Sequence, residues 1–226
     1  GQTEERKRFL ECRNSPQSAA LRHVFFAERA TAKVPGIPAD LAPRPVAQVA
    51  VIGAGTMGGG IAMHFAQAGI AVTLVETGQE ALDRGLGLVR NNYETSRKRG
   101  RFTGEQVETF LSLITGTTDY ADISSVDVVI EAVFENLAVK KQVFTQLDAV
   151  CKADCILATN TSYLDINAIA AVTNRPEQVI GAHFFSPANV MKLLEVVRAE
   201  KTADDVIVTF MKLAKTIGKI PGLVGV

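Results

Sequence analysis

The sequence predicts an α/β protein in which a doubly wound, mostly parallel sheet has helices on both faces and is preceded by a helical linker segment. Strand-like and helix-like segments alternate from residue 48 onward. Several of these strands are continuous apolar runs, which is the pattern of strands buried on both faces. The first 46 residues differ, being helix-like and then rich in proline. We therefore expect two parts, residues 1–46 and residues 47–226.

Composition excludes several classes of protein. The 226 residues are 47% apolar and carry a formal net charge of +0, so there is no basic excess to bind nucleic acid. No apolar run approaches the ~20 residues that span a bilayer. The three cysteines, Cys12, Cys151 and Cys155, are too few and too isolated for a disulfide framework, and no metal site is expected.

The first part should begin with helices. Residues 1–32 are helix-like, with a break at residues 14–16, where Asn and Ser offer capping oxygens and Pro starts a helix. The second helix carries an apolar stripe, Leu21, Val24 and Phe25, which should dock on another surface. Residues 33–46 hold four prolines and predict an extended linker lying over a surface.

The second part is expected to run strand by strand. QVAVIG at 48–53 is a continuous apolar strand, followed by a helix at 56–69 and a strand at 70–76. A long helix at 79–97 precedes the strand VDVVIEAV at 126–133 and the helix 137–150. Further strands are expected at 155–160, 178–185 and 192–197. A helix at 204–217 then leads to a last strand beginning at 222.

A glycine-rich turn lies at the end of the first strand. Its residues are Gly53, Ala54, Gly55, Thr56, Met57 and Gly58. This G-x-G-x-x-G follows a strand, opens a helix and has an acidic residue, Glu76, at the end of the next strand, which is the context of a Rossmann-type dinucleotide site. The pyrophosphate would lie on the helix N-terminus. Glu76 would accept the adenosine ribose hydroxyls and repel a 2′-phosphate, so NAD is favoured over NADP.

Further motifs follow in a fixed order. GAGTMG, VIEAVFENLAVK, ATNTSYLDI, GAHFFSP and VMKLLEVV together resemble the 3-hydroxyacyl-CoA dehydrogenases, from residue 48 to the end. The HFFSP variant and the preceding helix and linker resemble the multifunctional β-oxidation enzymes. The resemblance implies NAD-dependent oxidation of L-3-hydroxyacyl-CoA to 3-ketoacyl-CoA in fatty acid β-oxidation. It also implies that this chain is the cofactor-binding fragment of a larger enzyme.

The same resemblance suggests site residues. The family's catalytic base falls on His183 and its carboxylate partner on Glu195, and Ser162 falls near the substrate oxygen and the nicotinamide. Glu135 and Lys140 fall on cofactor-contacting positions, whereas Ser186 stands where other members carry asparagine. A histidine base suits the reaction because the hydroxyl proton of the substrate must be removed near neutral pH. A carboxylate beside the histidine can fix the tautomer of its ring. His23 and His64 fall in expected helices without partners and are expected to be structural.

The resemblance also implies partners. The family takes a catalytic asparagine, much of the acyl-CoA pocket and a homodimer contact from a following helical domain, which this sequence does not contain. An enoyl-CoA hydratase/isomerase domain is expected upstream, and a cytoplasmic location of the bacterial type, with a peroxisomal one as the alternative. Two other functions stay open: another β-hydroxyacid dehydrogenase, which would use a lysine base, and a non-catalytic NAD-binding or structural relative.

Overall fold

The structure is a computed structural model that describes residues 1–31, 33–38 and 40–226. The chain forms two compact units, Gly1–Gly36 and Ile37–Val226. No helix in these described ranges is both long and apolar enough to cross a membrane.

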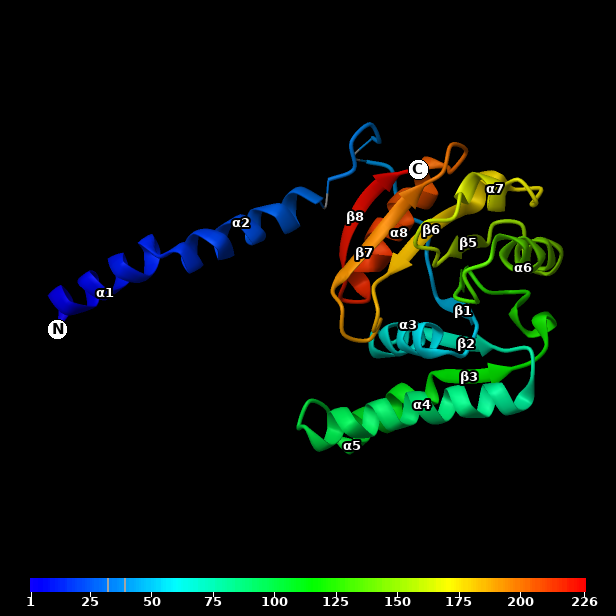
Figure 1. The fold of residues 1–226 in the computed structure, drawn as a ribbon, viewed down its shortest axis with the longest axis horizontal. Coiled ribbons are helices and arrows are strands. Elements are labelled where there is room, and N and C mark those ends of the chain that lie inside the picture. The colour runs from blue at the N-terminus through cyan, green and yellow to red at the C-terminus, as the bar shows by residue number, and fades with distance from the viewer. Residues whose placement is uncertain (32, 39) are drawn as a thin grey trace. The chain divides into compact units, whose positions relative to one another are not determined.

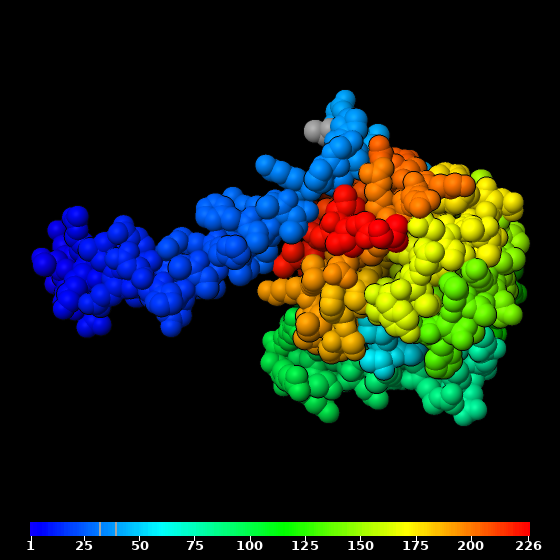
Figure 2. All heavy atoms as spheres, turned by 45° about the horizontal axis from the view of Figure 1, so that its top comes forward, coloured from blue at the N-terminus to red at the C-terminus, as the bar shows by residue number. Residues whose placement is uncertain are grey.

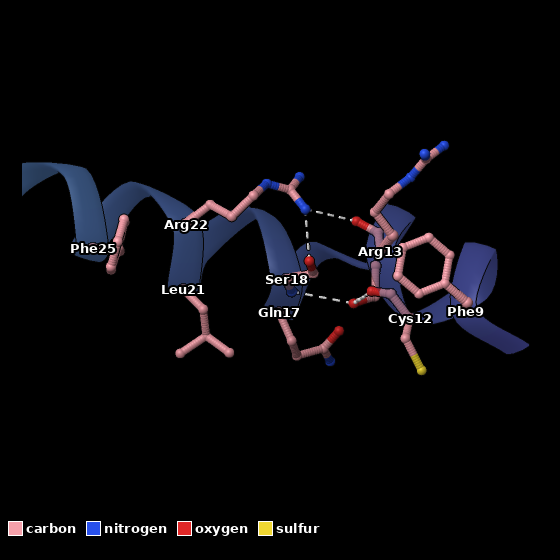
Figure 3. A pocket seen from close by; sticks show the side chains of 9 residues that line it. Phe9, Cys12, Arg13, Gln17, Ser18, Leu21, Arg22 and Phe25 are labelled. Carbon is pink, nitrogen blue, oxygen red and sulfur yellow. Dashed lines mark hydrogen bonds between the residues drawn. The ribbon is translucent and has the colours of Figure 1, made fainter.

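The first unit consists of two helices, α1 (Gln2–Asn14) and α2 (Pro16–Thr31). The predicted break is confirmed: Ser15 is extended, at φ −68° and ψ 151°, and its hydroxyl accepts a hydrogen bond from the backbone N–H of Ser18 at 3.1 Å. Neither helix contains a buried residue. Figure 3 shows Phe9, Leu21 and Phe25 around a shallow hollow shared by the two helices. Docking of the predicted stripe, Leu21, Val24 and Phe25, stays a prediction.

The second unit is built on one eight-stranded sheet, whose order is β3-β2-β1-β4-β5-β6-β7-β8. All neighbouring strands are parallel except β6 and β7, which are antiparallel, so the predicted mostly parallel sheet is confirmed. The strands are β1 (Gln48–Ile52), β2 (Ala71–Val75), β3 (Ile114–Thr117), β4 (Val128–Glu131), β5 (Ile156–Thr159), β6 (Val179–Phe184), β7 (Leu193–Arg198) and β8 (Ile220–Gly225). In Figure 2 the red β8 lies at the surface beside the orange β7.

Helices cover both faces of this sheet. They are α3 (Thr56–Gln67), α4 (Gln79–Lys98), α5 (Gly104–Ser112), α6 (Leu137–Val150), α7 (Ile166–Ala170) and α8 (Asp204–Thr216), with 3-10 turns η1 (Tyr120–Ile123) and η2 (Pro176–Gln178). Ala50 and Ile52 of β1 join a core with α6 and α7, whereas Val51 faces α3. Figure 1 shows α4 and α5 beside β3 at one edge, and α8 beside β7 and β8 at the other.

Several elements were not expected from the sequence: α5, the edge strand β3, the short helix α7 and the 3-10 turns η1 and η2. Thr103 begins α5 in a capping box, in which its side chain accepts from the N–H of Gln106 and the Gln106 side chain accepts from the N–H of Thr103. The strand β3 is only four residues long and half polar, so its local signal is weak. It is a strand because β2 offers it a parallel partner.

Arg44, which belongs to the second unit, is bonded to the rest of that unit. The Nε of Arg44 lies 2.7 Å from a carboxylate oxygen of Asp205, and its backbone N–H donates to the hydroxyl of Thr209 at 2.9 Å. A further bond joins its guanidinium to the side chain of Gln178 at 2.6 Å. The residues around Arg44 therefore lie against α8, as an extended surface segment would; the predicted boundary after residue 46 stays a prediction.

Candidate functional site

The site lies at the carboxyl ends of the central strands. From β1 the chain first builds β2 and β3 on one side and then β4, β5 and β6 on the other, so the strand order reverses beside β1. Open α/β sheets bind ligands in the crevice at such a switch point. A cavity of about 620 Å³ opens there, lined by residues from the glycine turn, the ends of β2 and β4 and helix α4, among them Gly53, Gly55, Glu76, Arg84, Tyr120 and Phe134.

The glycine turn has the geometry that the motif predicts. Gly53 has a φ of +100°, and a Cβ there would lie 2.8 Å from the carbonyl oxygen of Ala132. A Cβ on Gly58 would lie 1.8 Å from the carbonyl oxygen of Gly53, so only glycine lets α3 pack this close. Gly55 precedes the first turn of α3 and has open space around it. A phosphate group fits this turn, because the helix N-terminus presents free N–H groups.

Glu76 lies at the end of β2 and contacts the turn directly. Its Oε2 accepts a hydrogen bond from the backbone N–H of Ala54 at 2.8 Å, which the sequence alone did not predict. Arg84 also lines the cavity, and its guanidinium lies 2.6 Å from the carboxylate of Glu80. Arg84 lies in the second turn of α4, and it was not among the residues expected at the cofactor site.

His183 and Glu195 are brought together by the antiparallel pair of strands. They are direct register partners on β6 and β7, and the Nδ1 of His183 lies 2.8 Å from Oε2 of Glu195. The side chains are 17% and 34% exposed, so the pair is accessible without being fully solvated. Among the described residues, the Nε2 of His183 has no hydrogen-bond partner. This arrangement leaves one imidazole nitrogen free for a proton transfer while a carboxylate orients the other.

Glu135 and Ser162 lie together at the ends of β4 and β5. The Oε1 of Glu135 accepts from the backbone N–H of Ser162 at 2.8 Å and also from the hydroxyl of Thr161. Burial alone would raise the pKa of Glu135, but these hydrogen bonds and the charge of Lys140 outweigh it and hold the pKa below its usual value. Glu135 is therefore a carboxylate at neutral pH. The side chain of Lys140 is fully buried and lies 3.2 Å from the other oxygen of Glu135.

Ser186 is exposed on the connection between β6 and β7. His64 and Lys219 bond to the backbone of Ala188 in the same connection. His64 has a partner after all, contrary to the expectation above: its Nε2 lies 2.8 Å from the carbonyl oxygen of Ala188. Burial, with the nearby charge of Lys219, lowers the pKa of His64 to about 4, so the ring is neutral and donates. Lys219 donates to the same carbonyl at 2.6 Å and to that of Met191.

Sequence reasoning also missed Asn160, which joins the ends of β5 and β6. Its side-chain oxygen accepts from the backbone N–H of Phe184 at 2.8 Å, which places the end of β6 against that of β5. Asn160 belongs to the quoted segment ATNTSYLDI, but nothing in the local pattern points to its partner.

Comparisons with known proteins agree with this geometry. The family described as 3-hydroxyacyl-CoA dehydrogenase, NAD binding domain, matches residues 48–225. A peroxisomal fatty acid β-oxidation multifunctional protein of Oryza sativa subsp. japonica is 45% identical over 226 residues, which is 100% of this chain and 31% of that protein. A peroxisomal bifunctional enzyme of Cavia porcellus is 44% identical over 231 residues, again 100% of this chain and 31% of that protein. The chain thus spans about a third of the length of these relatives.

A solved structure is similar as well. It is the 3-hydroxybutyryl-CoA dehydrogenase of Escherichia coli K12, which superposes with a TM-score of 0.79 at 42% identity and covers 80% of this chain and 39% of the other. The chain belongs to the 3-hydroxyacyl-CoA dehydrogenase family, of which it carries the NAD-binding domain, and its cofactor is NAD.

Proposed function

We propose that this chain is the cofactor-binding part of an enzyme that oxidises L-3-hydroxyacyl-CoA to 3-ketoacyl-CoA in fatty acid β-oxidation. The observation that carries the proposal is the 2.8 Å contact between His183 and Glu195. His183 lies on β6, which pairs with β5 in the same sheet as the glycine turn. A non-catalytic relative would have no need of this pair. A dehydrogenase with a lysine base would not need it either.

In this proposal the dinucleotide is held by the glycine turn of residues 53–58 and by Glu76, and when bound it supplies the hydride acceptor. His183 takes the hydroxyl proton of the substrate on Nε2. Glu195 keeps the ring in the tautomer that carries its proton on Nδ1, and it stabilises the imidazolium that forms. Ser162 and Ser186 are exposed at the ends of neighbouring strands, where they would contact the substrate oxygen and the cofactor, respectively.

The proposal extends to the rest of the protein. The relatives are about three times longer than this chain and are named as multifunctional or bifunctional enzymes. We therefore place a helical dehydrogenase domain after the present one and a hydratase/isomerase domain before it, with a homodimer contact in the helical domain. The names of the relatives also favour a peroxisomal location for this protein over a cytoplasmic one.

The test uses the chain extended through the following helical domain, with NADH absorbance reporting oxidation of an L-3-hydroxyacyl-CoA. His183→Gln should lower kcat by about 10²–10⁴-fold, the usual contribution of a general base, and leave NADH affinity unchanged. Glu195→Gln should lower kcat in the same direction. His23→Gln is the matched control, because His23 is exposed on α2.

A His183→Gln enzyme as fast as the wild type would remove the base assignment. An unaltered protein that binds NADH but oxidises no 3-hydroxyacyl-CoA would refute the proposed activity.

A further inference from the structure

A buried charge lies at the end of β4, beside the end of β5. Glu131, the last residue of β4, is fully buried. It belongs to the quoted segment VIEAVFENLAVK, but neither the resemblance nor the proposed mechanism gives it a role. Burying a carboxylate is costly unless each oxygen has a partner. Glu131 therefore needs an explanation within the site.

Both oxygens of Glu131 are occupied. Oε1 accepts from the Nζ of Lys140 at 2.7 Å and from the backbone N–H of Val133 at 2.8 Å. Oε2 accepts from the hydroxyl of Thr159 at 2.7 Å. The carboxylate thus joins the end of β4, the end of β5 and the first turn of α6, and it fixes the backbone beside Ala132, on which Gly53 packs.

Lys140 links Glu131 to Glu135. Its ammonium lies between the two carboxylates, at 2.7 Å from Glu131 and 3.2 Å from Glu135, and its side chain is 0% exposed. A side chain with no exposed surface does not touch a bound ligand directly. Glu135, by contrast, is 29% exposed and also holds the backbone of Ser162 at 2.8 Å.

We propose that Glu131 is a positioning residue of the cofactor site, which through Lys140 holds the carboxylate of Glu135 and the backbone of Ser162 in place. Lys140 then acts through Glu135 and not by its own contact with the cofactor. This inference rests on the proposed function, because it needs a dinucleotide across the carboxyl ends of the strands. The adenosine half of a bound dinucleotide would lie toward Glu76, at the end of β2, and its nicotinamide half would then lie toward β4 and β5.

The geometry predicts that the two halves of the cofactor respond differently. ADP carries only the adenosine half, which the glycine turn and Glu76 would hold. NADH carries both halves. Loss of the contacts among Glu131, Lys140 and Glu135 should weaken the binding of NADH and leave the binding of ADP unchanged. A general loosening of the fold should weaken the binding of both ligands.

The test variant is the double substitution Glu131→Gln with Lys140→Met. It removes both buried charges together, so no carboxylate is left unpaired, and Gln still offers an oxygen to the N–H of Val133 and an amide to Thr159. Calorimetry on the chain should show NADH binding weakened by about tenfold, the loss of one hydrogen bond to a charged group, with ADP binding unchanged. Thr159→Val is a milder second variant that should shift NADH affinity in the same direction.

The control pair joins the same strand and helix at the opposite end of the sheet. The Nζ of Lys152, after α6, lies 2.6 Å from Oδ1 of Asp127, before β4. Asp127→Asn with Lys152→Met should leave both affinities unchanged. Unaltered NADH binding in both test variants, or an equal loss of NADH and ADP, would overturn the positioning role. Failure of the unaltered chain to bind NADH would instead overturn the proposed function, on which the inference rests.

Discussion

Glu76 meets two demands with one carboxylate. One oxygen accepts the backbone N–H of Ala54 at 2.8 Å and so fixes the glycine turn, while the carboxylate also lines the cavity. Because of this position, we expect the residue to contribute both to the shape of the turn and to the choice of cofactor. A ribose diol fits beside it, whereas a 2′-phosphate would bring like charges together.

The chain should accordingly bind NAD more tightly than NADP. Glu76→Gln removes the negative charge but keeps an oxygen that accepts from the N–H of Ala54. The variant should bind NAD about tenfold more weakly, and the ratio of its affinities for NAD and NADP should be smaller. Calorimetric titration of both cofactors on both proteins measures this. Arg84→Ala is the companion variant, because Arg84 lines the same cavity with a positive charge. Equal affinity of the unaltered chain for NAD and NADP would contradict the role of Glu76.

Most individual roles at the cofactor turn followed from the sequence, because that motif is local. The roles of Asn160, His64 and Glu131 did not. Each depends on a partner brought close only by the fold: Asn160 bonds to the backbone of Phe184, and His64 bonds to a carbonyl 124 positions away. No spacing rule reports such contacts before the sheet order is known.

Helix α6 shows how an element is ended by a distant segment. Arg175, in the turn before β6, donates to the backbone oxygens of Asp148 in the last turn of α6, of Cys151, which caps the helix, and of Lys152 just beyond it. The carbonyl of Asp148 is one of those that a helix C-terminus leaves without a partner within the helix. The side chain of Asp148 binds the same guanidinium at 2.7 Å, and both side chains are nearly buried. Burial alone would raise the pKa of Asp148, but hydrogen bonds from Arg175 and Asn174 hold it below its usual value.

This contact predicts a pH dependence of stability. A carboxyl whose pKa is lower in the folded state stabilises the fold above its unfolded pKa, about 3.9, and loses that contribution as pH falls through the folded value. Asp148→Asn should therefore lower the free energy of unfolding at pH 7 by about 1.5–3 kcal/mol, and the difference should shrink toward pH 2–3. Urea unfolding at several pH values measures it. Asp204→Asn is the control, because the Arg198–Asp204 pair is exposed, and a difference of similar size there would refute the argument.

At the level of elements, strong periodicity sufficed for prediction and weak periodicity did not. The expected helix at 137–150 coincides with α6, and each strand that was expected from the sequence is a strand of the sheet. The short edge strand β3 and the 3-10 turns lack enough residues to show a period. The antiparallel direction of β7 was also not predicted, although it is what makes His183 and Glu195 direct partners.

The molecule as a whole leaves apolar side chains uncovered around the site. Phe134 is 86% exposed, Tyr163 77%, Val190 59% and Met191 43%. They follow β4, β5 and β6, on the loops that also carry Glu135, Ser162 and Ser186. Large apolar side chains exposed after the carboxyl ends of neighbouring strands are a candidate contact surface. Together with the greater length of the relatives, this supports the proposal that a further domain completes the site.

The last prediction follows from that incomplete enclosure. The chain on its own should bind NADH but oxidise 3-hydroxyacyl-CoA slowly, although His183 and Glu195 are both in place. Substrate positioning and a donor to the substrate oxygen are each typically worth at least about 2–4 kcal/mol of barrier. Losing both should slow turnover by about three orders of magnitude or more, and joining the proposed helical domain should restore it. NADH absorbance in paired assays, at equal cofactor saturation, measures the ratio. The control is His183→Gln in the isolated chain, which should lower any residual rate further if that rate comes from this site. An isolated chain as fast as the extended one would show that the exposed edge of the sheet already forms a complete active site.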